Sequence, residues 1–215
     1  MTVTRYYFRE ARTENDFQNI FALRYRIYCL ENKWLPANDY PDNLEKDIYD
    51  EYSKHFIAES QQQVIIGSIR LILSDKLEPH QTLPICKHPN IKRQSLCMAQ
   101  SAEISRLVVD RKVRWGDVSL GLYRIMYQYT MDNHIHYWYI AVDEYFLHIL
   151  QKLGFPFQAI GSAGNYMGTT VPAMLSVKKG SIELLKNNMR FMDWFQDSPY
   201  TLKQNRLIPH FLRRT

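Results

Sequence analysis

Apolar side chains recur at three- and four-residue steps in several parts of the chain, which is the pattern of helices with one buried face. The first such part is 16–31, where Phe17, Ile20, Phe21, Arg24 and Tyr28 fall on one side. Asn15 or Asp16 is expected to cap its start. The same periodicity predicts helices over 118–131, 145–153 and 181–195.

Short runs rich in β-branched and aromatic residues lie between these helices and predict strands. The runs are 55–58, 64–73, 102–109, 136–142, 155–160 and 171–177. Residues 59–63 are expected to turn between the first two runs. Residues 34–41 and the long polar stretch 74–100 read as loops, and a loop as long as the second is often functional or mobile. Strands that alternate with helices predict a layered α/β fold with a mixed central sheet flanked by helices, as one domain over residues 1–215.

Several charged residues interrupt these apolar segments, and a buried charge is costly unless it is paired or used. Arg24 lies on the apolar side of the first helix, Arg70 ends the run Gly-Ser-Ile-Arg, and Glu103 and Arg106 bracket Glu-Ile-Ser-Arg. We therefore expect these charges to converge on one site. If the strand alternates regularly, Glu103 and Ser105 share one face, and Ile104 and Arg106 the other.

The spacing of these residues resembles the acyl-homoserine-lactone (autoinducer) synthases and their relatives, the N-acyl amino acid synthases and exosortase-associated acyltransferases. The resemblance runs from about Phe21 to Leu175, although Tyr28 stands where the family usually has Phe. It is carried by Arg24, Tyr28, Trp34, Asp47, Asp50, Arg70, Glu103 and Arg106. It implies the GNAT acyltransferase fold, with Glu103 and Ser105 as catalytic candidates and the other seven residues at the substrate site.

Amide formation needs a neutral amine, and a carboxylate can remove the proton that an α-amine carries at neutral pH. Glu103 is the best candidate for this base, and an ion-pair partner of Arg70 or Arg106 is the alternative. Main-chain N–H groups of Leu107, Val108 and Val109 would hold the oxyanion if the strand splays there. Asp47 and Asp50 would recognise a cationic amine, pin Arg24 or Arg70, or have no role.

The stretch after Val109 bears on the acyl donor. GNAT enzymes that use coenzyme A hold its pyrophosphate on a glycine-rich turn before a helix, whereas residues 109–119 retain only Gly116. We therefore expect no bound cofactor, with an acyl carrier protein thioester as donor in preference to acyl-CoA. Arg111, Lys112 and Arg114 would meet the acidic carrier, or are simply exposed charges.

A second stretch narrows the resemblance within the family. Tyr166, Gly168 and Pro172 match a Tyr-x-Gly-x-x-x-Pro stretch of the N-acyl amino acid synthase and exosortase-associated branch, although Met167 stands where that branch often has His. Apolar residues here would line an acyl tunnel or form ordinary core. The leading interpretation is acyl transfer to the amine of a small molecule, with an amino acid as the first candidate. The alternatives are an acyl-homoserine-lactone synthase using S-adenosylmethionine, and a non-catalytic carrier- or nucleic-acid-binding module.

Composition adds limits to partners and location. The formal net charge of +5 favours acidic partners, but the basic residues are dispersed and no nucleic-acid-binding signature accompanies them. No apolar run approaches a membrane span, and the N-terminus lacks the core of a signal peptide. The three cysteines have no metal or redox spacing, which predicts a cytoplasmic setting. His134 and His136 lack a third ligand, so no metal is expected.

Overall fold

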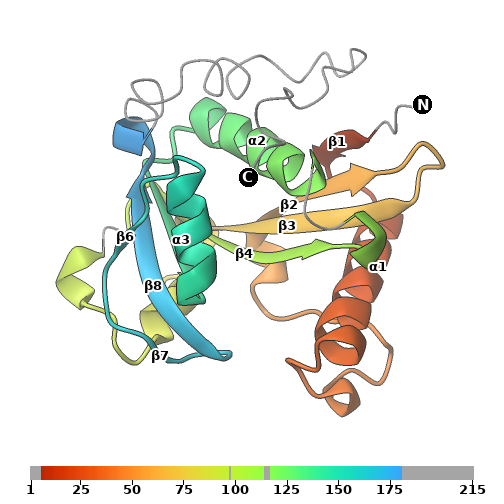
Figure 1. The fold of residues 1–215 in the computed structure, drawn as a ribbon, viewed down its shortest axis with the longest axis horizontal. Helices are drawn as coiled ribbons and strands as arrows, with labels where there is room; N and C mark the ends of the chain where they lie inside the picture. Colours follow the sequence, from red (N-terminus) through yellow and green to blue (C-terminus); the bar gives the residue numbers. More distant parts are fainter. Residues whose placement is uncertain (1–5, 97, 114–116, 181–215) are drawn as a thin grey trace.

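The computed structural model describes residues 6–96, 98–113 and 117–180. Within these residues the chain forms an eight-stranded sheet in the order β1-β2-β3-β4-β5-β8-β6, with β7 also paired to β8 (Figure 1). The strands are Tyr7–Glu10, Ser53–Glu59, Ile65–Leu73, Ser101–Val109, Tyr137–Val142, Gln158–Ala159, Gly164–Asn165 and Thr169–Ser176, numbered β1 to β8. The pairing of β4 with β5 is parallel and the other pairings are antiparallel, so the predicted mixed sheet is confirmed.

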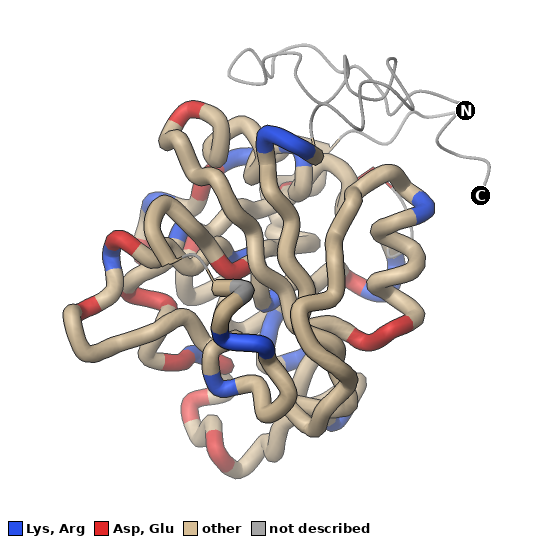
Figure 2. Tube along the Cα trace, turned by 90° about the vertical axis from the view of Figure 1, so that its left-hand side faces the viewer, with Lys and Arg blue, Asp and Glu red and all other residues tan. Residues whose placement is uncertain are grey.

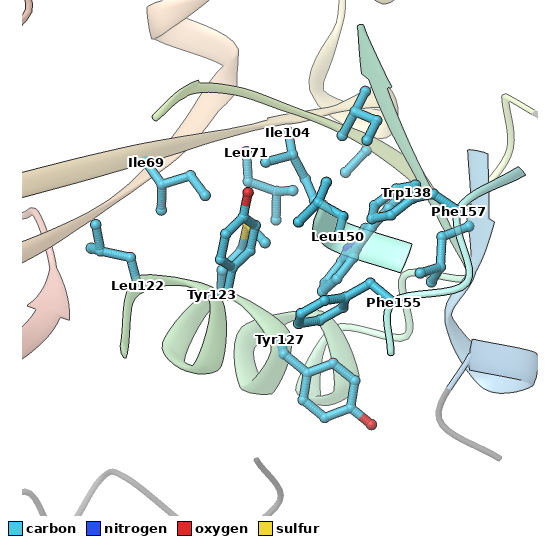
Figure 3. Packing of buried hydrophobic residues seen from close by; sticks show 14 of the residues in the cluster. Ile69, Leu71, Ile104, Leu122, Tyr123, Tyr127, Trp138, Leu150, Phe155 and Phe157 are labelled. Atoms are coloured by element: carbon cyan, nitrogen blue, oxygen red, sulfur yellow. The ribbon is translucent and has the colours of Figure 1, made fainter. Parts of the chain in front are cut away.

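Helices cover the two faces of this sheet differently. The helices α2, Asp117–Asp132, and α3, Glu144–Lys152, pack on one face, and α1, Glu14–Tyr25, packs on the other (Figure 1). Figure 3 shows the core under α2 and α3, where Leu122 and Tyr123 meet Ile69, Leu71 and Ile104 of the sheet. The aromatic and leucine residues of the second half, including Trp138, Leu150 and Phe155, belong to this packed core. The structure therefore favours ordinary core for these residues over an acyl tunnel.

The first helix starts two residues earlier than the sequence pattern indicates. Thr13 is its N-cap and forms a capping box with Asp16, so the expectation that Asn15 or Asp16 would cap the helix is wrong. Asp16 also accepts two hydrogen bonds from Arg9, which fixes it in the first turn. The helix continues as a π-helix over Arg26–Glu31, so its predicted end is confirmed.

The predicted strands are found with small shifts, apart from two differences. The strand expected over 155–160 shrinks to Gln158–Ala159, because Phe155 and Phe157 are buried in the core on either side of Pro156, which cannot donate to a ladder. Two strands were not predicted, namely the edge strand β1, which pairs with β2, and the two-residue strand β7, which pairs with β8. The helix predicted over 181–195 lies outside the described residues.

The long stretch 74–100 is packed onto the sheet rather than extended from it. It contains short 3-10 turns, and Leu83 and Ile85 have no exposed surface. These two residues pack against Ile72 of β3 and Tyr139 of β5. The loop and α1 therefore cover different parts of the same face of the sheet, and the predicted charged residues lie on that face.

Candidate active site

A β-bulge in β4 shapes the site. Arg70 pairs with Ser105 and Ser68 with Val108, so Arg106 and Leu107 together face Ile69. Arg106 has φ +50°, a left-handed conformation that is uncommon for a residue other than glycine. The extra residue keeps Arg106 on the face that carries Ser105. The expectation that Arg106 would share a face with Ile104 is therefore wrong, because a bulge breaks the two-residue alternation.

The two strands at the centre of the sheet also separate at this point. Among the described residues, the parallel pairing of β4 with β5 runs from Ser101 with Tyr137 to Glu103 with Tyr139 and then ends. Beyond Glu103, β4 continues to Val109 and β5 to Val142 without pairing to each other. The separation of β4 from its neighbour that an oxyanion role of residues 107–109 requires is thus present, and it begins beyond Glu103.

Six charged side chains from α1, the loop after it, β3 and β4 form a closed ring in which arginines and carboxylates alternate. In order around the ring they are Arg24, Glu45, Arg106, Asp47, Arg70 and Asp50. The N–O distances lie between 2.6 and 3.1 Å, and Arg24 also binds Glu45. Each arginine contacts two carboxylates and each carboxylate contacts two arginines, so the formal charges of the ring cancel.

The ring is closed to solvent on one side and open on the other. The side chains of Arg24 and Glu45 have no exposed surface, whereas Asp47 is 27% and Arg106 11% exposed. Burial alone would raise the pKa of Asp50, but Arg24 and Arg70 outweigh it and hold that pKa below its usual value. The pKa of Asp47 is lowered by Arg70 and Arg106 in the same way, against its burial. Both aspartates thus pin arginines, the second of the three roles considered for them.

Glu103 lies on the same face but outside the ring. Its Oε2 accepts a hydrogen bond from the main-chain N–H of Ile85 at 2.7 Å, and only 3% of the residue is exposed. Burial raises the pKa of Glu103 to about 7, although the Ile85 N–H, Arg70 and Arg106 favour its ionised form. The hydrogen bonds of Arg70 and Arg106 to carboxylates go to ring members, so the structure does not support Glu103 as their ion-pair partner.

Ser105 and His55 support the ring from the strands. The Ser105 hydroxyl accepts a hydrogen bond from Arg70 Nε at 3.0 Å, which places this catalytic candidate against the ring. His55, which sequence reasoning missed, lies between Phe17 and Phe21 with Nε2 at 3.5 Å from Asp50 Oδ1. Burial lowers the pKa of His55 to about 4, so its imidazole is neutral at pH 7 and leaves the charge balance unchanged.

The predicted aromatic residues stack at the open side of the ring. The Arg106 guanidinium lies over the Tyr28 ring at 5.7 Å, and the Tyr28 hydroxyl donates to the Leu107 carbonyl oxygen at 3.3 Å. Trp34 packs against Tyr28 with ring centroids 5.5 Å apart, yet it remains 66% exposed. Trp34 therefore borders the site and does not cover the core.

Glu45 is a second residue that sequence reasoning missed. It falls in the same short run as Asp47 and Asp50, and that run of acidic residues was the available signal. A carboxylate with no exposed surface between two arginines cannot be told from an exposed neighbour, such as Lys46, by spacing alone.

The residues predicted to bind the acyl donor are less tightly grouped. Leu107 adjoins the bulge, whereas the buried Val108 packs in the α1 cluster and Val109 in the α2 cluster. Arg111 and Lys112 lie exposed in a 3-10 turn after β4. The structure does not bring these two residues into the ring. Arg114 and Gly116 lie outside the described residues.

The turn after β4 is occupied by an acidic side chain. Asp110 Oδ1 accepts the main-chain N–H of Lys112 at 2.9 Å, and its Oδ2 accepts from Arg26 at 2.7 Å. An N–H group that could face a phosphate is therefore taken by a carboxylate.

The described residues also bear on a metal site and a membrane span. No group of three His, Cys, Asp or Glu there is placed to hold a metal ion, and His134 and His136 are both exposed. None of the helices in this part of the chain is long and apolar enough to cross a membrane. Figure 2 shows short stretches of Lys and Arg and of Asp and Glu scattered over the described part of the chain, with uncharged stretches between them.

Comparison with known proteins agrees with this architecture. The acetyltransferase (GNAT) domain family matches residues 23–124, while no curated protein sequence matches the chain. The CoA-dependent acyl-homoserine lactone synthase BjaI, solved with SAM and isopentyl-CoA, superposes with a TM-score of 0.69 at 19% identity and covers 91% of this chain and 89% of its own.

Two other solved structures are similar. The acyl-homoserine-lactone (AHL) synthase LasI has a TM-score of 0.63 at 16% identity, over 86% of this chain and 94% of its own. FeeM, an N-acyl amino acid synthase from uncultured soil microbes, has a TM-score of 0.61 at 16% identity, over 86% of this chain and 97% of its own. The sequence match and the superpositions thus agree on the GNAT fold, and the structures to which the chain is similar are autoinducer synthases and an N-acyl amino acid synthase, the families that the spacing of the charged residues resembles.

Proposed function

We propose that the protein transfers a fatty acyl group from acyl carrier protein to the amine of a small molecule, most simply an amino acid. The observation that carries this proposal is the carboxylate of Glu103. It is buried where β4 and β5 separate, it stands outside a charge-balanced ring, and its pKa is raised to about 7. A general base works best when its pKa lies near the working pH.

The reaction follows from these positions. An α-amine has a pKa near 8 and is mostly protonated at pH 7. Glu103 takes a proton from the amine, and the nitrogen lone pair attacks the thioester carbonyl carbon to form a tetrahedral intermediate. Main-chain N–H groups between Leu107 and Val109 stabilise the oxyanion. The C–S bond then breaks as the second excess proton passes from the nitrogen to the leaving thiolate, which gives the amide and a thiol, and the proton that Glu103 received is released to solvent.

The turn after β4 supports acyl carrier protein as the donor. Asp110 places a carboxylate there and accepts the N–H of Lys112, whereas a pyrophosphate would need free N–H groups and no neighbouring negative charge. Arg111 and Lys112 are exposed and suit an acidic carrier surface. BjaI is described as CoA-dependent, so the donor is the first variable to test. A protein that acts with this carrier would work in the cytoplasm.

A second candidate is an acyl-homoserine-lactone synthase, which would acylate S-adenosylmethionine and then close a lactone. The extent of the similarity to BjaI, whose structure contains SAM, favours it. The match of Tyr166, Gly168 and Pro172 to the N-acyl amino acid synthase branch favours the first candidate. The third candidate is a non-catalytic carrier- or nucleic-acid-binding module. Such a module has no use for Glu103, a buried carboxylate that forms no ion pair among the described residues.

One assay separates these candidates. The protein is incubated with acyl carrier protein thioesters or acyl-CoA and with each L-amino acid or S-adenosylmethionine, and the products are identified by mass spectrometry. We expect N-acyl amino acids from the carrier thioester; lactone together with methylthioadenosine would support the second candidate, and no product the third. The E103Q variant should lower turnover about 10²–10⁴-fold, the usual contribution of a general base. E144Q, an exposed glutamate on α3, is the control, and turnover of E103Q equal to this control would make Glu103 structural.

A further inference from the structure

Arg106 retains one donor nitrogen, Nη1, that makes no hydrogen bond within the ring. Its Nε binds Glu45 and its Nη2 binds Asp47, at 3.1 and 2.9 Å. Its Nη1 instead points at the Met167 sulfur, 3.7 Å away on the exposed side. A thioether is a weak acceptor, so this charged N–H can bind an anionic oxygen at the open side of the ring.

The Tyr166 hydroxyl is a second donor near this site, because Tyr166 precedes Met167 and interacts electrostatically with Arg106, Glu103 and Asp47. Tyr166 begins the turn between β7 and β8, whose shape is fixed by Met167 at φ +52° and Gly168 at φ +106°. The hydroxyl has no hydrogen-bond partner among the described residues, and Met167, the next residue, contacts Arg106. Burial raises the pKa of Tyr166, and Glu103 raises it further, so the phenol stays protonated. Such a phenol is a poor proton source for a leaving thiolate but a good neutral hydrogen-bond donor.

His88 holds this turn in place. It is 2% exposed, and its Nδ1 accepts the main-chain N–H of Asn90 at 3.2 Å. That bond leaves the proton on Nε2, which donates to the Thr170 carbonyl oxygen at 3.0 Å. The His88 ring packs against Tyr166 with centroids 5.7 Å apart. Ile85, three residues before His88, binds Glu103, so one loop segment positions both the base and the phenol.

We propose that Arg106 Nη1 and the Tyr166 hydroxyl form a subsite for the carboxylate of the acceptor, which directs the amine of the same molecule toward Glu103. The acceptor is then an α-amino acid or a molecule that carries one, and this inference rests on the proposed acyl transfer. The fixed charges of the ring cancel, so a zwitterion with a cationic amine and an anionic carboxylate adds no net charge to the site. The carboxylate is held by directed hydrogen bonds, which are stronger when one partner is charged.

The first test uses Tyr166→Phe, which removes only the hydroxyl. The wild type and the variant are compared on matched acceptors, L-leucine with L-leucinamide and L-tyrosine with L-tyrosinamide. We expect kcat/KM for the acid to fall roughly tenfold to a hundredfold, the range for a hydrogen bond to a charged group, mainly through KM. The value for the amide should fall much less, because its neutral carbonyl oxygen accepts a weaker hydrogen bond than a carboxylate does. Because each variant is judged by its own acid-to-amide ratio, the different amine pKa values of the two acceptors cancel.

The control for this variant is Tyr145→Phe on α3, where the side chain is 74% exposed; it should leave both acceptors unaffected. If Tyr166→Phe lowers acid and amide equally, the hydroxyl does not bind a carboxylate, and the subsite is wrong while acyl transfer stands. If no amine is acylated by the wild type, the proposed function itself fails.

The second test fills the subsite from the protein itself. Met167→Glu places a carboxylate beside Arg106 Nη1, and Met167→Gln is its neutral counterpart. We expect Met167→Glu to lose the acid acceptors selectively while it still acylates the amides, and Met167→Gln to retain both. Equal use of the acids by the two variants would overturn the subsite. Repeating the series with S-adenosylmethionine and its decarboxylated form identifies whether the amino-acid group belongs to a free amino acid or to this larger molecule.

Discussion

Asp50 and Glu103 are both buried carboxylates on one face of the sheet, and their pKa values move in opposite directions. The Asp50 side chain is 7% exposed and Glu103 is 3% exposed, so desolvation disfavours ionisation of both. Asp50 contacts two guanidinium groups, and its pKa is lowered. Glu103 accepts a main-chain N–H, and its pKa is raised to about 7. Burial therefore does not fix the protonation of a carboxylate; the charge of its partners does.

The bulge in β4 completes the charge balance of the ring to which Asp50 belongs. Because Arg106 adopts a left-handed conformation, its side chain reaches Glu45 and Asp47 and completes the ring. In a regular strand it would point toward α2, and the ring would contain three carboxylates and two arginines. The strained residue thus balances the charge of the ring, and its hydrogen bonds to carboxylates go to Glu45 and Asp47 rather than to Glu103.

The largest effect on stability should come from removing a buried cation. Arg24→Met removes the guanidinium that pairs with both Glu45 and Asp50, and breaking such a buried pair costs about 3–5 kcal/mol. We expect the midpoint of urea unfolding to fall accordingly. Arg24→Lys, which keeps the charge but loses the two-sided geometry, should lie between the wild type and Arg24→Met, and it serves if the latter fails to fold.

Arg26→Met is the matched control, two residues along the same helical segment. Arg26 pairs with Asp110 at 2.7 Å, but 45% of its side chain is exposed. Such a pair contributes about 0–1 kcal/mol. Equal losses for the two variants would mean that the ring is no more than a set of surface ion pairs.

Glu103 should behave in the opposite way when its charge is removed. Its folded pKa is raised, so stability is greatest when both states are protonated and declines as pH rises from about 4.5 to about 7. Glu103→Gln has no such decline and can still accept the Ile85 N–H. We expect this variant to gain about 2–3 kcal/mol relative to the wild type between pH 5 and pH 8, at about 1.4 kcal/mol per pKa unit. Unfolding at the two pH values measures it.

Asp50→Asn is the counterpart within the ring. The folded pKa of Asp50 is lowered, so the carboxylate stabilises the protein above its unfolded value near 3.8 and loses this contribution as pH falls below it. Asp50→Asn should therefore be destabilised at pH 7 and approach the wild type in acid. If the unfolding free energies of Asp50→Asn and Glu103→Gln changed with pH in the same way, the two carboxylates would not differ as proposed.

Much of the fold could be predicted from local patterns. The periodicity of α1, α2 and the strands β2 to β5 fixed their existence to within a few residues, because each has one continuous buried face. The bulge at Arg106 could not be predicted, since it depends on the register of β4 against β3 rather than on its own residues. The packing of residues 74–100 was also missed, because Leu83 and Ile85 are buried by contacts with distant strands.

The sequence predicted which residues converge on the site, but not how they pair with one another. Embedded charges indicated that Arg24, Arg70 and Arg106 converge, which the structure shows. Which carboxylate is paired and which is free could not be read from spacing. Glu45 resembles an exposed loop residue in the sequence, and Glu103 resembles an ion-pair partner of Arg106.

Arg111 and Lys112 differ from the buried carboxylates because they remain in water. Reversing their charges should have the smallest effect of all these substitutions. Arg111 and Lys112 are exposed, and the variant R111E/K112E should leave the stability nearly unchanged. It should weaken the use of acyl carrier protein about severalfold through slower association. The loss should grow as salt is lowered, because screening of the like-charge repulsion is then least. Adding Arg114→Glu should increase the loss further.

The control has the same change in net charge. K178E/K179E reverses two exposed lysines in the helical segment that follows β8, so it alters the overall field of the protein by the same amount at a different place. If both double variants slow transfer equally, the carrier senses only net charge and there is no docking site at the turn after β4. If R111E/K112E also slows transfer from acyl-CoA to the same degree, the damage lies at the active site. Efficient turnover of the wild type with acyl-CoA alone would overturn the carrier protein as donor, while Glu103 would keep its role as base.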